Sequence, residues 1–184
     1  PRGATGSVLR TEAITTMTQS LEDLLEALED VDDATREEAA KALAELGDPK
    51  TIDPLVSACS DDFWSVRAYA GCAVAKIGGP KALEALVGLF NDTIMEVRNQ
   101  AVEATAKMGA AVVERMIAAL KDERWRVREH AAKTCGEIRD KAAVDALIAV
   151  CRDRDGAVKS AAAEALGKIR DAKAVPALIK LFRD

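Results

Sequence analysis

The chain has 184 residues, of which 49% are hydrophobic and only 3% aromatic, and its formal net charge at pH 7 is −5. It is long enough to bury a continuous core, but that core must consist mainly of Ala, Leu, Val and Ile side chains. No stretch approaches the roughly 18 apolar residues of a membrane span, and no basic-then-apolar leader with a cleavage site is visible. We therefore expect a cytoplasmic protein without membrane contact.

The charge is distributed unevenly along the chain. Residues 1–92 contain 8 Lys and Arg against 17 Asp and Glu, whereas residues 93–184 contain 18 against 14. Two interpretations stay open. The solvated faces differ without functional meaning, or the polarity serves a polarised partner or head-to-tail contact between copies.

Residues 1–16 show no apolar periodicity and are rich in Gly, Thr and Ser, so we expect a flexible leader. Met17 directly precedes the first amphipathic segment, and we interpret it as the natural start of a chain whose leader was added during cloning. A processed or truncated natural tail is the alternative. Residues 17–184 are predicted to form a single repeat domain.

From Asp30 onward, the same residue types recur every 30 or 31 positions. Each unit is marked by a basic residue, at Arg36, Arg67, Arg98, Arg128 and Lys159. An aspartate stands six positions earlier, at Asp30, Asp61, Asp92, Asp122 and Asp153. Small and aliphatic residues follow three and ten positions later, at Ala39, Ala70, Ala101, Ala131 and Ala162 and at Leu46, Ile77, Met108, Ile138 and Ile169. This spacing places them on one face of a helix.

A second amphipathic helix precedes each aspartate, as the apolar residues Ile52, Leu55, Val56 and Cys59 of the second unit illustrate. Two short helices that each carry one apolar stripe cannot bury it alone, so consecutive units must stack into an elongated solenoid. The last helix, from about Ala174, has no following partner. It is either the C-terminal cap, or the array continues.

Turn residues define several helix boundaries. The first Arg-bearing helix is predicted over residues 33–46 and is ended by Gly47, while Pro49 and Pro80 mark the starts of the next helices. The third unit is one residue shorter within residues 109–122, and we place this deletion in the turn between its two helices.

The pattern Asp-x5-Arg followed by Ala-Ala-x-Ala-Leu-Gly resembles the HEAT repeat, in the short form called the phycobilisome-lyase HEAT-like repeat. The resemblance covers nearly all of residues 21–184. It implies an all-α fold, a right-handed α-solenoid of about five two-helix repeats plus one terminal helix. It also implies that the Arg-bearing inner helices line the concave face. The Asp and Arg columns should form a ladder along the stack, in which Lys159 bonds less rigidly.

The resemblance raises one metal-dependent activity that the residues exclude. Deoxyhypusine hydroxylase builds a di-iron centre from His-Glu pairs that directly follow the repeat arginine. The corresponding pairs here contain a single histidine, in the reversed order Glu129-His130. With one histidine in the chain and no Cys-x-x-Cys, we expect no metal site, no cofactor and no enzymatic activity.

Two other functions of the family stand as alternatives. Phycobilin lyases share the repeat, so the chain could be an accessory subunit of such an enzyme, although no residue marks a bilin site. DNA glycosylases with HEAT-like repeats line their concave face with basic and aromatic residues. The acidic sequence pI of about 5.1 argues against nucleic acid here.

The expected binding surface comes from two columns on the inner helices. Positions three before and two after the basic residue are large in the three central repeats: Trp64, Tyr69, Met95, Gln100, Trp125 and His130. The candidate set is completed by the basic residues Lys76, Lys107, Arg126 and Lys133. The three lysines, together with Glu103 and Glu129, are expected to form a mixed rim around this surface. Because such aromatic centres dominate interface energetics, we predict a non-catalytic scaffold that binds a peptide or protein on its concave face. The alternative is that the two tryptophans only pack on the adjoining turns.

Overall fold

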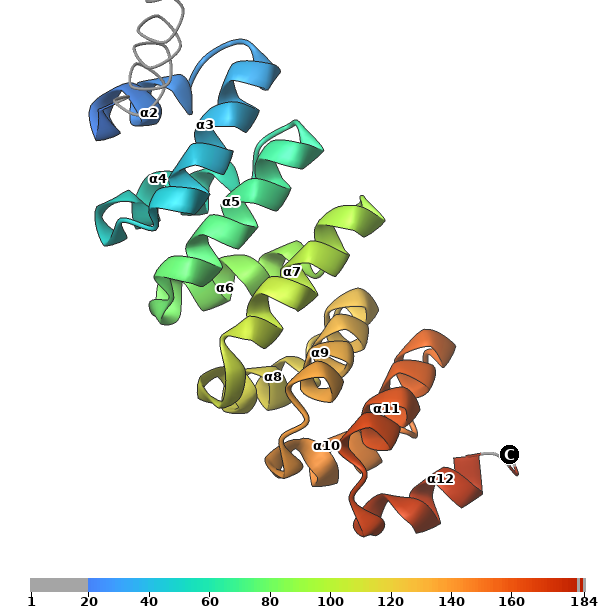
Figure 1. The fold of residues 1–184 in the computed structure, drawn as a ribbon. Coiled ribbons are helices and arrows are strands. Elements are labelled where there is room, and N and C mark those ends of the chain that lie inside the picture. The colour runs from blue at the N-terminus through green and yellow to red at the C-terminus, as the bar shows by residue number, and fades with distance from the viewer. Residues whose placement is uncertain (1–19, 182, 184) are drawn as a thin grey trace, which may run out of the picture.

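The structure is a computed structural model that describes residues 20–181 and 183. The regular elements of this part of the chain are helices, stacked in pairs into an elongated solenoid of two layers (Figure 1). The all-α solenoid predicted from the sequence is thereby confirmed. The expected leader, residues 1–16, lies outside the described residues. No helix within the described range is long and apolar enough to cross a membrane.

The two layers differ in helix length. The inner layer contains the longer helices α3 (Asp33–Leu46), α5 (Trp64–Ile77), α7 (Met95–Lys107), α9 (Trp125–Ile138) and α11 (Gly156–Ile169). The outer layer contains α2 (Leu21–Ala27), α4 (Ile52–Ala58), α6 (Gly79–Leu89), α8 (Val113–Ala119), α10 (Val144–Val150) and α12 (Val175–Leu181). Short 3-10 turns lead into four outer helices: η1 (Pro49–Thr51), η2 (Gly109–Val112), η3 (Lys141–Ala143) and η4 (Ala172–Ala174).

Local signals explain the limits of α3. Its bounds agree with the prediction over residues 33–46, because both ends carry capping residues. The Asp32 side chain accepts a hydrogen bond from the backbone N–H of Thr35, which satisfies a donor that the first turn leaves free. At the other end Gly47 takes a left-handed conformation with φ +63°, and its N–H donates to the carbonyl of Leu43.

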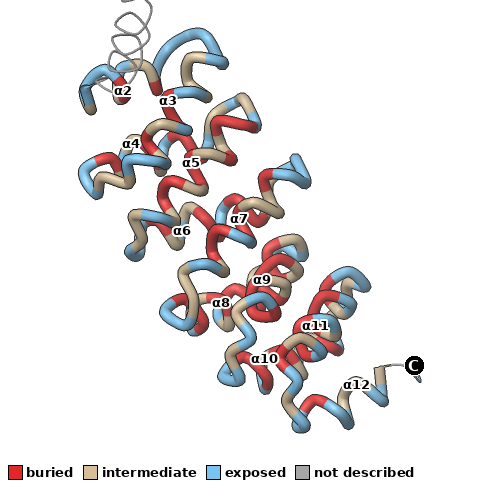
Figure 2. The backbone as a smooth tube through the Cα atoms, in the orientation of Figure 1, coloured by how far each residue is buried: buried red, intermediate tan, exposed pale blue. Residues whose placement is uncertain are grey.

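The repeated alanines allow the inner helices to pack closely. Three positions after each basic residue, the alanine is at most 3% exposed in every unit, and buried residues gather in the inner helices (Figure 2). The column ten positions after the basic residue was also expected in the core. That expectation is wrong for Leu46, which is 54% exposed, and it holds for Ile169, which is 7% exposed. Leu46 is the last residue of its helix and lies near the N-terminal end of the stack.

The deletion in the third unit falls where the sequence placed it, in the turn between α7 and α8. In three other units an aspartate caps the 3-10 turn, and its side chain accepts a backbone N–H: Asp48, Asp140 and Asp171. The corresponding turn η2 begins without any side-chain cap. The missing residue therefore removes a turn cap and shifts everything after it by one position relative to α7.

Two inner helices approach each other closely at Gly136 of α9. A Cβ atom added there would lie 2.8 Å from the Cα and 3.0 Å from the Cβ of Ala165 in α11. A backbone atom cannot move aside as a side-chain end can, so this contact requires glycine. Gly167 of α11 has no heavy atom within 4 Å of such a Cβ and provides the matched control.

We expect Gly136→Ala to force α9 and α11 apart and to lower the free energy of unfolding by about 1–3 kcal/mol. Gly167→Ala should leave it unchanged or raise it by about 0.5–1 kcal/mol, since alanine restricts the unfolded chain at an exposed helical site. Urea denaturation of both variants measures the difference. Equal effects at the two positions would show that α9 and α11 do not meet so closely.

Candidate binding surface

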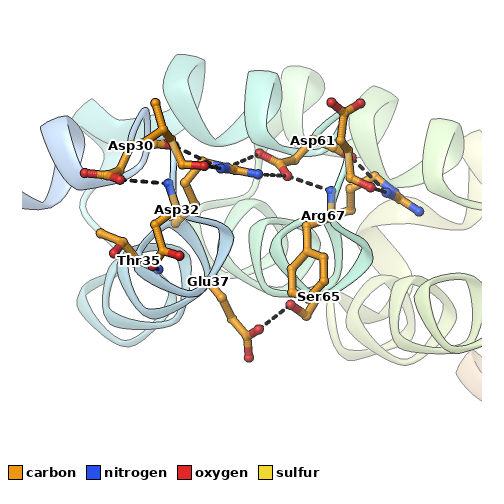
Figure 3. Close-up of polar contacts among 11 residues, drawn as sticks. Asp30, Asp32, Thr35, Glu37, Asp61, Ser65 and Arg67 are labelled. Atoms are coloured by element: carbon orange, nitrogen blue, oxygen red, sulfur yellow. Dashed lines mark hydrogen bonds and ion pairs between the residues drawn. The ribbon is translucent and has the colours of Figure 1, made fainter.

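Paired arginines and aspartates hold consecutive units at a fixed spacing. The guanidinium of Arg67 donates from Nε and Nη2 to the Asp92 carboxylate of the next unit, at 2.6 and 2.9 Å. Its Nη1 donates backward to the carbonyls of Asp61 and Asp62 at the start of its own unit. Arg36 with Asp61 and Arg128 with Asp153 repeat the arrangement. We call this set of contacts the Arg–Asp ladder; Figure 3 shows its first steps, from Asp30 to Arg67.

The ladder carboxylates are held ionised by their partners. Burial alone would raise the pKa of Asp92, but the bonds from Arg67 and from the Ile94 backbone N–H outweigh it and lower that pKa. Asp61 behaves in the same way, with Arg36 and the Phe63 N–H as donors. A forked, charge-assisted pair of this kind fixes both distance and orientation. Each inner helix is thereby positioned relative to the next.

The ladder fails at one junction, which corrects the continuous ladder implied by the family resemblance. Arg98 keeps its backward bonds to the carbonyls of Asp92 and Thr93, but its buried Nε has no hydrogen-bond partner. The Asp122 carboxylate is instead bound within its own loop by Arg124, at 2.8 and 2.9 Å. The acceptor expected for Lys159 would stand 25 positions later, at Asp184, which lies outside the described residues.

Large apolar side chains are exposed at the first turns of three consecutive inner helices. Trp64 begins α5 and is 40% exposed, Met95 begins α7 and is 63% exposed, and Trp125 begins α9 and is 39% exposed. Ile94, directly before α7, adds a fourth exposed side chain. We call these four residues the apolar row. The first turns of the inner helices lie along one edge of the solenoid, at the upper right of Figure 1.

The guanidinium of Arg126 lies over the Trp125 ring, 4.9 Å from its centroid. This cation–π contact covers one side of the ring and holds it in place. The first turns of α5, α7 and α9 also lack a side-chain cap, whereas Asp32 and Asp155 cap α3 and α11. The central three units thus depart together from the two that flank them.

The second predicted column, two positions after the basic residue, does not form an exposed strip in the central units. His130 is 2% exposed and its Nδ1–H donates to the Arg126 carbonyl at 2.7 Å, with the Phe90 ring 6.2 Å away. The expectation that His130 belongs to an exposed strip is therefore wrong. Tyr69 is half-buried against the core, and Gln100 is half-buried and donates to Glu96 of its own helix. In the three central units packing therefore covers the positions two after the basic residue wholly or in part, whereas Glu38 of the first unit is exposed.

Arg126 lies at the apolar row, on the Trp125 ring, but the three predicted lysines lie away from the row. Lys76 is twelve positions after Trp64, which is about 18 Å along the helix axis, and Lys107 stands equally far from Met95. Lys76 donates to the Ala44 and Glu45 carbonyls at the end of α3, and so it joins two units. Lys133 is bound by Glu129 at 2.7 Å. None of these three lysines lies beside the apolar row.

Two grooves mark the end of the inner layer opposite the apolar row. One has a volume of about 730 Å³ and is lined by small residues of α3, α5 and α7 together with Lys76 and Lys107. The other, of about 690 Å³, runs across α7, α9 and α11, with Lys107, Lys133 and Glu137 among its lining residues. Three of the predicted lysines therefore line grooves and not the aromatic surface.

Sequence reasoning missed Ile94. It stands two positions after a ladder aspartate, in a series that reads Asp32, Phe63, Ile94, Arg124 and Asp155. The signal was present, since an aliphatic residue in a polar turn is unusual. This series lies outside the helical periodicity that defined the two predicted columns. Arg124 in the same series is the residue that captures Asp122.

The described residues offer no assembled metal site, because no three His, Cys, Asp or Glu side chains converge there. Burial raises the pKa of the Cys59 and Cys135 thiols to about 12, so both are uncharged at neutral pH. Burial also raises the pKa of Cys72, which lies half-buried in a groove. The Cys59 and Cys135 thiols have the character of core residues.

A family model for HEAT repeats matches residues 21–106 and 113–184. The chain belongs to the HEAT-repeat family. The interruption of the match falls at the α7–η2 turn, where this HEAT protein has its one-residue deletion. No curated protein sequence matches the chain.

Solved structures share the fold of this HEAT protein at low sequence identity. A structure from work on microtubule plus-end tracking by XMAP215, CLIP-170 and EB1 has a TM-score of 0.67 at 17% identity, covering 92% of this chain and 91% of that chain. The S. pombe condensin Cnd3–Cnd2 subcomplex gives 0.53 at 19%, covering 89% and 26%. The CpcE–CpcF complex of phycocyanin lyase from Nostoc gives 0.52 at 19%, covering 91% and 71%. These likenesses show the fold alone.

The buried His130 gives the stability of this HEAT protein a pH dependence. Burial lowers its pKa, opposed by the Arg126 carbonyl and the Glu129 charge and assisted by the charges of Lys133 and Arg98. Because the unfolded chain binds the proton first, stability is lost as pH falls below the unfolded value of about 6.5, and the loss ends below the depressed folded-state pKa.

We expect His130→Gln to remove this component. Chemical denaturation between pH 7.5 and 5 should show that the wild-type protein loses more unfolding free energy than the variant, although both share the contributions of their carboxylates. Parallel curves for the two proteins would mean that His130 is accessible to protons in the folded state.

Proposed function

We propose that this HEAT protein is a non-catalytic scaffold that binds a peptide or protein segment along the apolar row. One observation carries the proposal: Trp64, Met95 and Trp125 are exposed at the same position of three consecutive units. Their equivalence under the repeat places them on one edge, about 10 Å apart per unit. The flanking units have Asp33 and Gly156 at this position.

The residue types favour a protein over a nucleic acid. Tryptophan, methionine and isoleucine provide large contact areas, and tryptophan is among the commonest anchor residues in protein interfaces. A nucleic-acid backbone would require unpaired basic side chains along the surface. Lys76 and Lys107 lie about 18 Å along their helices from Trp64 and Met95, and Lys133 and Lys168 are already bound by glutamates.

The row also has a length that suits a short segment. Three units span about 20 Å, which an extended peptide crosses in about six residues and a helix in about thirteen. HEAT structures of similar fold occur in the condensin subcomplex and in the CpcE–CpcF complex, and these associations support a partner-binding role by analogy. An accessory role beside an enzyme, as in a phycobilin lyase, is the alternative form of the same proposal.

The double variant Trp64→Ala, Trp125→Ala tests the proposal. Peptides of about 12 residues are selected from a displayed random library against the wild-type protein, and their affinities are measured by calorimetry. We expect the variant to lose about 2 kcal/mol or more, which is roughly 30-fold in Kd, because anchor residues contribute on this scale.

The matched control removes two exposed apolar side chains elsewhere. Val175 and Ile179 on α12 are 50% and 49% exposed, and their double alanine variant should bind the selected peptides normally. Selected peptides that bind the tryptophan variant as well as wild type would contradict the proposal. A tryptophan variant that loses its cooperative unfolding transition would assign both rings a structural role.

A further inference from the structure

The junction between α7 and α9 combines an unsatisfied arginine with an aspartate bound elsewhere. At the other described steps of the ladder the acceptor stands 25 positions after the arginine. Asp122 comes 24 positions after Arg98, because the deleted residue lies between them. Arg98 therefore has a buried Nε without an acceptor, while the carboxylate expected to accept from it is bound by Arg124.

A second arginine explains why Asp122 is turned away. Arg124 stands two positions after the aspartate, where the other units have Asp32, Phe63, Ile94 and Asp155, none of which can bind a carboxylate by charge. It holds both Asp122 oxygens, and this bond lowers the pKa of Asp122 to about 2. Asp122 thus has two competing partners, one in its own loop and one in the preceding unit.

The two alternatives differ in their surroundings. The Arg124 side chain is 49% exposed, so its ion pair with Asp122 is open to water and salt. The ladder pairs are much more enclosed, for example 13% and 7% exposed for Arg67 and Asp92. Transfer of Asp122 to Arg98 would give a buried donor its missing acceptor and free Arg124 into water, where a guanidinium is well solvated. In the first state Arg98 keeps only its carbonyl partners, and in the second Arg124 is left to water, so each state leaves one arginine without a carboxylate and the two can lie close in free energy.

Three further features are consistent with a weaker interface between α7 and α9. The axes turn here, since α7 lies nearly in the plane of Figure 1 while α9 is foreshortened. The groove that involves Lys107 and Lys133 opens between these helices. Turn η2, which leads from α7 to α8, lacks the aspartate cap of its counterparts.

From these observations we propose that the α7–α9 junction is a two-position joint in the solenoid, in which Asp122 exchanges between Arg124 and Arg98. With Asp122 on Arg124 the joint is open, as in this structure. With Asp122 on Arg98 the ladder is complete and the two halves are locked. The joint divides the apolar row between Met95 and Trp125, so it would adjust the spacing of the binding surface; that consequence alone rests on the proposed function.

A double-mutant cycle tests the exchange without any partner. Methionine replaces arginine because it keeps an aliphatic side chain of similar length and removes the guanidinium group. In the wild-type background, Arg98→Met should lower the urea midpoint less than Arg67→Met, which removes a complete ladder pair. In the Arg124→Gln background Asp122 is free to reach Arg98, so Arg98→Met should now lower the midpoint as much as Arg67→Met does.

Amide hydrogen exchange provides the second measurement. We expect exchange in α8 and α9 to slow severalfold in Arg124→Gln, because the completed ladder suppresses local opening. Arg154→Gln is the control, since it makes the same charge change in the next loop, and it should leave both measurements at wild-type values. Two results would overturn the joint. One is that Arg98→Met lowers the urea midpoint equally in the wild-type, Arg124→Gln and Arg154→Gln backgrounds. The other is that amide exchange in α8 and α9 is unchanged in Arg124→Gln.

Discussion

The bidentate contact between an arginine and the aspartate of the next unit is the constraint on which this structure depends. Alanine and leucine faces supply the area that drives stacking, but an apolar face of small residues tolerates many registers and angles. The guanidinium fork does not, because it binds a carboxylate in one plane and at one distance. By also bonding the carbonyls of its own loop, each ladder arginine ties three segments together: the inner helix, the loop before it and the loop after it. The positions of exposed side chains along the solenoid follow from this spacing.

This dependence explains which parts of the structure could be predicted from the sequence. The helix over residues 33–46, its end at Gly47 and the buried alanine column follow from periodicity and capping, which are local. The burial of His130 does not follow from such local signals. Its position relative to the arginine suggests a solvent face when the helix is considered alone, but the neighbouring unit packs over it and places the Phe90 ring nearby. The angle between units decides this, and a sequence pattern does not contain that angle.

The candidate surface was predicted in part for the same reason. Trp64, Met95 and Trp125 are exposed as expected, since they begin their helices and the next unit cannot reach over them. The lysines were expected around them because they share the inner helices, but twelve positions already separate Lys76 from Trp64 by about 18 Å along the helix axis. The deletion near Gly109 was visible in the sequence, yet its effect on Arg98 was not. Only the placement of Asp122 beside Arg124 reveals that the ladder is broken there.

An exposed tryptophan at the start of a helix can serve either the turn beside it or a partner molecule, and we assign Trp64 and Trp125 to a partner. The most direct test is a structure of the protein in complex with a peptide selected for binding to it. If the two rings are anchors, the peptide lies across the first turns of α5, α7 and α9, with its apolar side chains against Trp64 and Trp125. A peptide seated in the groove beside Lys107, or on the outer helices with both tryptophans uncovered, would contradict this assignment.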